Sequence, residues 1–145
     1  MFLIDTNIIS EIVAKYPNKN VLDFLEKNRN FLYLSVVTIG EIKAGIEKLE
    51  NSKRKIYLLH WLEELKINFN DKILNIDIEV MLKWGEIISI LQKKGISISI
   101  MDGLIASSAI RYKMILVTRN EKDFKNIDDL KIINPFKEDY EMEIN

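Results

Sequence analysis

Five short apolar segments recur along the chain, separated by longer stretches whose apolar residues have helical spacing. The segments are Phe2–Ile4, Phe31–Ser35, Lys72–Ile76, Met114–Thr118 and Ile132–Ile133. A short segment that is apolar almost throughout, rather than alternating, is typical of a strand covered on both faces. Strands that alternate with helices predict a parallel, doubly wound sheet and therefore an α/β fold.

Helix boundaries follow from capping residues and from apolar residues three or four positions apart. Asp5-Thr6-Asn7 supplies the start of a helix that is expected to run to Val13. Further helices are expected around Val21–Leu25, from the capping box Thr38–Glu41 to Leu49, from Ser52 to Leu65, from Asp77 to Lys94, and from Ser99 onward. The helices on either side of Asn51-Ser52 are joined by a short loop, which predicts an antiparallel pair projecting from the sheet.

The length of 145 residues is usual for one domain and allows a sizeable core. We expect a single domain over residues 1–137, followed by an acidic, mobile tail at 138–145. The net charge is −1, and it becomes +3 when the four acids of the tail are left out. Basic clusters at 53–55 and 93–94 are better explained as solvated helix faces than as a phosphate-attracting surface.

The chain contains no cysteine, which excludes disulfides and thiolate metal sites and fits a cytoplasmic protein. No signal-peptide pattern or membrane-length apolar run is present, so no membrane association is expected. The single histidine, His60, stands beside Trp61 in an apolar helix, where packing or surface exposure explains it best. A Ser-His-Asp mechanism is therefore excluded, and the absence of a P-loop or G-x-G-x-x-G motif argues against nucleotide binding.

Four acidic residues that are distant in sequence stand close to predicted strand ends. Asp5 ends the first strand, Glu41 follows the second by about one turn, Asp102 begins the helix that leads into the fourth strand, and Asp123 follows that strand. The crevice of a doubly wound sheet lies at the carboxyl ends of its strands, so topology brings these four residues together. Gathered carboxylates repel one another and need a cation, and a hard ion such as Mg2+ takes oxygen ligands.

Each acid also has a structural explanation. Asp5 can cap the helix that follows it, although Thr6 can do the same. Glu41 completes a capping box, Asp102 can stabilise the helix dipole, and Asp123 can lie in an ordinary surface loop. The functional interpretation is favoured because the fold delivers all four to one edge of the sheet.

Four ordered motifs resemble those of the PIN-domain family, and among its members the VapC toxins of toxin–antitoxin pairs. They are Met1–Asn7 with Asp-Thr-Asn, Glu41 near a helix start, Met101–Ala106, and Thr118-Arg119-Asn120 with Asp123-Phe124. Together they cover essentially the whole chain. The resemblance implies a three-layer α/β/α fold with a five-stranded parallel sheet, and endoribonuclease activity that depends on Mg2+ or Mn2+.

The resemblance also implies roles for particular residues and partners. Asp5, Glu41 and Asp102 correspond to the first three acids of the family, whereas the fourth falls either at Asn120 or at Asp123. Family members use the projecting helix pair for dimerisation and antitoxin docking, so a homodimer and an antitoxin partner are expected.

The working hypothesis is hydrolysis of RNA by an ion held between Asp5, Glu41 and Asp102, with Asp123 completing the site. Thr6 is expected to orient a carboxylate or to contact phosphate, and Asn120 to orient Asp123 or to accept a water of the metal shell. One rival is a non-catalytic PIN-like module that binds protein or RNA, which does not explain why repelling carboxylates are kept together. A receiver-type phosphoacceptor is a weaker rival, because the first strand ends in a single Asp.

Overall fold

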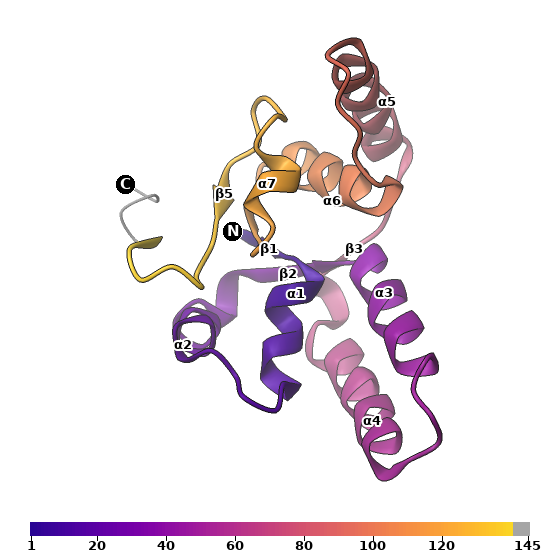
Figure 1. Ribbon diagram of the computed structural model, residues 1–145, viewed down its shortest axis with the longest axis vertical. Coiled ribbons are helices and arrows are strands. Elements are labelled where there is room, and N and C mark those ends of the chain that lie inside the picture. The colour runs from indigo at the N-terminus through magenta and orange to yellow at the C-terminus, as the bar shows by residue number, and fades with distance from the viewer. Residues whose placement is uncertain (141–145) are drawn as a thin grey trace.

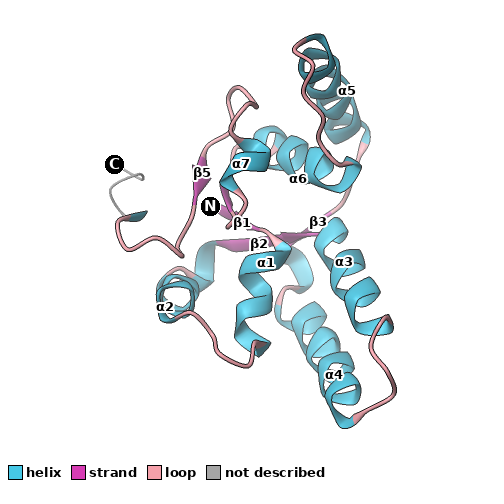
Figure 2. Ribbon diagram, viewed as in Figure 1, coloured by secondary structure: helices cyan, strands magenta, loops and turns pink. Residues whose placement is uncertain are grey.

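The structure of the protein is a computed structural model, in which residues 1–140 are described. Five strands form one sheet in the order β3-β2-β1-β4-β5, and all neighbouring pairs are parallel (Figures 1 and 2). The strands are β1 (Phe2–Ile4), β2 (Leu32–Ser35), β3 (Ile73–Leu74), β4 (Ile115–Val117) and β5 (Ile132–Ile133). Each lies within a segment predicted from its apolar residues, and the expected parallel sheet is confirmed.

Helices cover both faces of the sheet, which gives the expected three layers (Figure 1). One face carries α1 (Thr6–Ile9), a 3-10 turn (Ser10–Val13), α2 (Lys19–Lys27), α3 (Val36–Glu47) and α4 (Lys53–Asn68). The other face carries α5 (Ile78–Lys93), α6 (Ile100–Arg111) and α7 (Glu121–Phe124). Short 3-10 turns at Arg29–Phe31 and Asn70–Lys72 lead into β2 and β3.

Two separate cores explain why the strands are apolar throughout. Successive side chains of a strand point to opposite faces. Leu3 accordingly packs against the core beneath α5, α6 and α7, whereas Ile4 packs against the core beneath α1, α2 and α3. Both residues are fully buried. A polar residue in place of Leu3 or Ile4 would lie in one of the two cores. The strand therefore does not alternate between polar and apolar residues.

Helix α6 lies close to the sheet because small residues line its buried face. Ala106, Ser107, Ser108 and Ala109 are all buried. The Ser107 hydroxyl donates to the Gly103 carbonyl at 2.6 Å, and the Ser108 hydroxyl donates to the Leu104 carbonyl at 2.9 Å. These bonds to the preceding turn satisfy hydroxyl groups that would otherwise be costly to bury.

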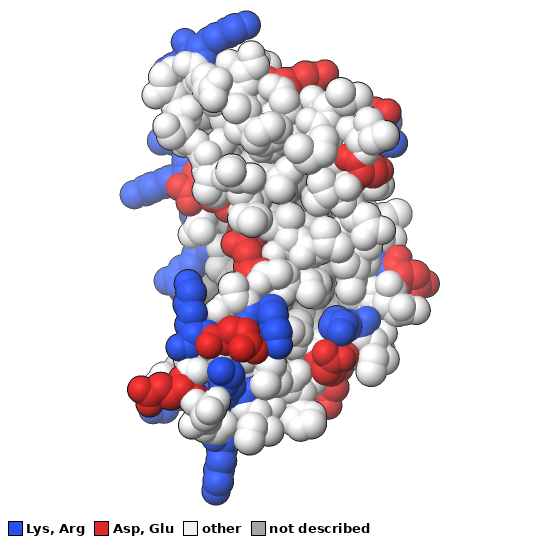
Figure 3. All heavy atoms as spheres, turned by 90° about the vertical axis from the view of Figure 1, so that its right-hand side faces the viewer, with Lys and Arg blue, Asp and Glu red and all other residues white. Residues whose placement is uncertain are grey.

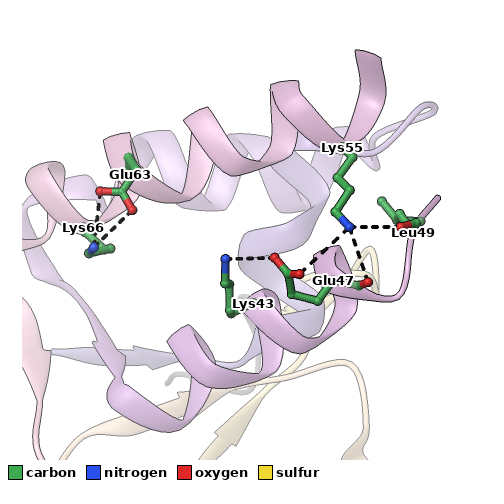
Figure 4. A network of polar contacts seen from close by, with 6 residues as sticks. All are labelled: Lys43, Glu47, Leu49, Lys55, Glu63 and Lys66. Atoms are coloured by element: carbon green, nitrogen blue, oxygen red, sulfur yellow. Dashed lines mark hydrogen bonds and ion pairs between the residues drawn. The ribbon is translucent and has the colours of Figure 1, made fainter. Parts of the chain in front are cut away.

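Helices α3 and α4 form the expected projecting pair, and a lysine bridges them (Figures 1 and 4). The Lys55 ammonium donates to the carbonyls of Glu47 and Leu49 at 3.5 and 3.1 Å, and it lies 3.9 Å from the Glu47 carboxylate. It thereby satisfies carbonyl groups at the end of α3, where the helix dipole favours a cation. Lys43 contacts the other oxygen of Glu47 at 2.9 Å.

The predicted capping box is wrong. Helix α3 begins at Val36, and its cap is Ser35, whose hydroxyl accepts a bond from the Val37 N–H at 3.1 Å. Thr38 lies inside the first turns and is fully buried, so it cannot serve as the cap. The pattern misled because an earlier serine, at the end of β2, takes the capping position. Glu41 therefore has no capping role.

Three further boundaries differ from the expectation. The first helix tightens from α-helix to a 3-10 turn at Ser10, and β3 contains only two residues. The segment after β4 forms the short helix α7 rather than an irregular loop. Within residues 1–140 no helix is long and apolar enough to cross a membrane.

Packed structure continues into the segment predicted as an acidic tail. Tyr140 is buried, and its ring meets that of Phe24 edge to face, with 5.6 Å between centroids. Phe24 makes a similar contact with Phe2 at 5.2 Å. The remainder of the predicted tail, residues 141–145, lies outside the described part of the chain.

Tyr140→Ala should lower the free energy of unfolding by roughly 2–4 kcal/mol, because it removes a buried ring and an aromatic contact. The matched control is Tyr16→Ala, since Tyr16 is 84% exposed and its loss should change stability by no more than about 0.5 kcal/mol. Urea denaturation measures both. Equal stability of the two variants would show that Tyr140 is not part of the core.

Candidate active site

The strand order reverses between β1 and β4, which places a crevice at their carboxyl ends. Asp5 follows β1 at this point, and its N–H donates to the Val117 carbonyl of β4 at 2.9 Å. Its side chain is only 4% exposed. The switch point of the sheet therefore holds a buried carboxyl group.

Three neighbouring groups donate hydrogen bonds to the Asp5 carboxylate. One oxygen accepts from the Thr6 N–H at 2.8 Å, so Asp5 is indeed the cap of α1. The other accepts from the Thr118 hydroxyl at 2.7 Å and from the Asn7 amide at 3.3 Å. All three donors are uncharged, so they orient the carboxylate without neutralising it.

Asn7 and Thr118 tie the two central strand ends together, and sequence reasoning assigned neither of them a role. The Asn7 amide oxygen accepts from the Arg119 N–H at 3.1 Å, and its amide nitrogen lies 3.5 Å from the Thr118 hydroxyl. That hydroxyl also accepts from the Asn120 N–H at 3.1 Å. Both residues stand inside motifs noted in the sequence, but only their contacts across the sheet reveal what they do.

Glu41 lies on α3, and the structure pairs it with Thr6. The Thr6 hydroxyl donates to a Glu41 carboxylate oxygen at 2.8 Å. This contact joins the first turn of α1 to α3 and fixes Glu41 next to Asp5. Thr6 thus orients a carboxylate, which is one of the two roles expected for it.

Asp102 lies in the first turn of α6, whose cap is Ser99. The Ser99 hydroxyl accepts from the Asp102 N–H at 3.1 Å and is also hydrogen-bonded to the Asp102 carboxylate. Asp102 is partly buried, whereas Asp123 and Asn120 are exposed on and beside α7. The Asn120 side chain does not cap α7, although its carbonyl accepts from the Asp123 N–H at 3.1 Å.

Burial and mutual repulsion destabilise the charged forms of two of these acids. Burial raises the pKa of Asp5, and the charges of Asp102 and Glu41 raise it further, against the lowering effect of the Thr118 and Thr6 bonds. Burial also raises the pKa of Asp102, and the charge of Asp123 adds to this. Electrostatic interactions thus connect the acids in the order Glu41, Asp5, Asp102 and Asp123.

None of the four acids forms an ion pair with a basic side chain of residues 1–140. Arg119 stands next to the site in sequence, but its guanidinium lies over the ring of Phe136, 4.4 Å from the centroid. The negative charge of the site is therefore left for a ligand to compensate.

The acids are near one another without forming a closed cluster. Among the residues that the structure describes, no three acidic or histidine side chains are close enough to hold one metal ion. The donor set nevertheless fits a hard divalent ion, because it consists of carboxylate and amide oxygens and contains no nitrogen or sulfur ligand.

Comparison with known proteins decides the family. A profile of the PIN domain matches residues 2–130. The chain belongs to the PIN-domain family. This confirms the resemblance seen in the four sequence motifs.

Similar PIN-domain proteins match over nearly their whole length. Toxin FitB of Neisseria gonorrhoeae is 33% identical over 138 residues, which are 94% of this chain and 99% of FitB. Ribonuclease VapC2 of Rickettsia felis is 31% identical over 137 residues, covering 92% and 97%. The crystal structure of FitAcB from N. gonorrhoeae contains a chain that superposes with a TM-score of 0.87 at 33% identity, covering 94% and 99%.

Asp102→Asn should raise the unfolding temperature of the metal-free protein at neutral pH. The pKa of Asp102 is raised in the folded state, so its ionised form opposes folding at pH values above that raised pKa. The advantage of the variant should shrink as the pH falls through the raised pKa, and it should vanish below the ordinary value of 3.8.

Thermal unfolding in a chelator, measured across this pH range, checks the expectation. Asp71→Asn is the control, because Asp71 is an exposed acid on the turn before β3. A wild-type protein that matches or exceeds the Asp102→Asn variant in stability at neutral pH would contradict this account of the site.

Proposed function

We propose that this PIN-domain protein is a metal-dependent endoribonuclease that acts as the toxin of a toxin–antitoxin pair in the cytoplasm. The observation that carries the proposal is the buried, uncompensated carboxylate of Asp5 at the switch point of the sheet, with Glu41 and Asp102 acting on it electrostatically. Relatives named toxin FitB and ribonuclease VapC2 support the same activity.

In this proposal Asp5, Glu41 and Asp102 hold Mg2+, and Mn2+ is the alternative ion. A bound divalent ion supplies an activated water and stabilises negative charge on the phosphate. The chain's own contribution is orientation. Asp5 is held by three donors, and Glu41 is held by the Thr6 hydroxyl. Such supporting contacts keep carboxylate oxygens aligned before the ion binds.

Asp123 is favoured over Asn120 as the fourth ligand. The charge of Asp123 acts on Asp102, which shows that the two carboxylates are within electrostatic reach. The backbone N–H of Asn120 is bonded to Thr118, and its side chain is exposed. Asn120 therefore suits a contact with a metal-bound water or with the RNA backbone.

A non-catalytic PIN-like module is the second candidate. It would bind RNA or protein without cutting, and it does not need a buried acid. The Asp5 carboxylate, however, is desolvated and is repelled by the charges of Asp102 and Glu41, which is unfavourable for folding. A cost of this kind is expected at a catalytic site, where perturbed groups gather.

Asp5→Asn should lower the rate of RNA cleavage by at least about 100-fold, since loss of even an outer partner of a metal ligand commonly costs 10–100-fold. The cleavage rate of the wild type and of the Asp5→Asn variant is measured on a mixed tRNA and rRNA pool, with Mg2+ and with EDTA. The Asp71→Asn variant is the control. Retained cleavage by the Asp5→Asn variant would refute the assigned role. Metal binding without cleavage by the wild type would favour the binding module or a missing substrate.

A groove beside the acids suits an antitoxin segment. It has a volume of about 390 Å3 and runs between α1 with its 3-10 turn and the α3–α4 pair. Val13, Ile42, Ile46, Leu58 and Trp61 are among its apolar lining residues, and Thr6 and Glu41 also line it. A segment with apolar side chains and one basic residue fits both the lining and the acids. The predicted homodimer stays a prediction.

Gly45→Phe should abolish inhibition by the antitoxin while cleavage continues. Gly45 lines the groove, and space for a side chain is open there. The control is Gly85→Phe on α5, where space is also open but the groove is distant. The test uses the small protein that the proposed toxin–antitoxin pair requires as its second member, and its co-purification with each variant and its inhibition of cleavage are measured. Equal inhibition of both variants would place the antitoxin elsewhere.

A further inference from the structure

Trp84 lies against the residue that follows Asp102 (helices α5 and α6 in Figure 1). A methyl group built on Gly103 would be 2.9 Å from Trp84 Nε1 and 3.1 Å from Cδ1. Carbon atoms do not approach other heavy atoms so closely without one of them moving. The indole edge therefore occupies the place of a side chain at position 103, and an alanine there would force the indole or the first turn of α6 to shift.

The indole N–H makes this contact unusual. Trp84 Nε1 is buried, and it has no hydrogen-bond partner within residues 1–140. A buried donor without a partner is unfavourable, and an indole N–H normally finds one. The contact with Gly103 is therefore kept although the indole N–H is left unpaired, a cost that a purely apolar ring would not carry. The position of the indole beside the first turn of α6 suggests what the contact is for.

Gly103 is itself fixed from several sides. Its N–H donates to the Ser99 carbonyl at 2.9 Å, and its carbonyl accepts from the Ser107 hydroxyl at 2.6 Å. Gly103, the residue after Asp102, is thus held in place by the cap of α6, by the following helical turn and by the indole of Trp84. Because Asp102 and Gly103 are adjacent in one helical turn, displacement of Gly103 displaces the Asp102 carboxylate.

We propose that Trp84 is a positioning residue that sets the place of the Asp102 carboxylate through its contact with Gly103. This rests on the proposed function, in which Asp102 helps to hold a divalent ion. Trp84 does not touch substrate or metal in this proposal. Its contact with Gly103 sets the position of the first turn of α6 relative to α5 and the sheet. That position determines the distance between the Asp102 and Asp5 carboxylates.

The test is a double-mutant cycle between Trp84 and Gly103, with Mg2+ affinity measured by calorimetry on the full chain. Gly103→Ala should weaken Mg2+ binding at least about 10-fold, in the range seen for residues that orient metal ligands. Trp84→Phe should weaken it several-fold. The double variant should bind Mg2+ more tightly than Gly103→Ala alone, because the smaller ring makes room for the added methyl group.

Gly85→Ala is the matched control, since it makes the same change at an exposed position of α5, next to Trp84 in sequence, with nothing within 4 Å of the new methyl group. It should leave Mg2+ affinity within about twofold of wild type, as expected for a surface substitution away from the site. Circular dichroism and cooperative unfolding above the assay temperature confirm that each variant is folded. A general loss of packing would lower stability without the recovery of affinity in the double variant.

Two results would overturn the proposal while leaving the proposed function intact. One is wild-type Mg2+ affinity in Gly103→Ala, and the other is a double variant that binds as weakly as Gly103→Ala alone. Should Gly103→Ala fail to fold, Trp84→Phe carries the test alone, and unchanged affinity refutes the role. A wild-type protein that neither binds Mg2+ nor cleaves RNA would refute both this proposal and the proposed function.

Discussion

A carboxylate buried at the point where the strand order reverses is the constraint on which the rest of the site depends. Asp5 is covered because both neighbouring strands and both helical layers meet there. Its charge is supported by an N–H, a hydroxyl and an amide, none of which carries a positive charge. A lysine or arginine at this place would stabilise the folded protein more, but it would also neutralise the group that a cation must find.

Polar side chains around Asp5 orient the acids of the site without neutralising them. Thr118 and Asn7 hold Asp5 from the two central strand ends, and Thr6 holds Glu41. Two basic residues of the described chain make contacts elsewhere. Arg119 packs over Phe136, and Lys55 joins α3 to α4. Figure 3 shows that acidic and basic side chains lie side by side over the lower part of one face, whereas the middle of the upper part is uncharged and has charged side chains at its edges.

Sequence reasoning located the strands and the four acids because both depend on local features. A fully apolar segment predicts a covered strand, and a parallel sheet brings residues at the carboxyl ends of its strands to one edge. It failed at the start of α3, where Thr38-x-x-Glu41 resembled a capping box, because the cap depends on where β2 ends. Ser35 occupies that position and leaves Glu41 free to pair with Thr6.

Contacts between distant residues could not be predicted in the same way. The bond from Thr118 to Asp5 spans 113 residues, and nothing local distinguishes this threonine from any other polar residue at a strand end. The same holds for Trp84, which looks like an ordinary apolar residue of an amphipathic helix until Gly103 is found beneath it. Such contacts depend on how whole helices pack against the sheet. They determine where the carboxylates lie relative to one another.

The acids come from the two helical layers on opposite faces of the sheet. Asp5 and Glu41 belong to the layer of α1 and α3, and Asp102 and Asp123 belong to the layer of α6 and α7. Each layer has its own core, and the sheet joins them. An ion bound by acids of both layers would therefore connect two layers whose carboxylates otherwise repel each other at this edge. Stabilisation by the ion should exceed that expected for acids on one element, because it removes repulsion between layers as well as within them.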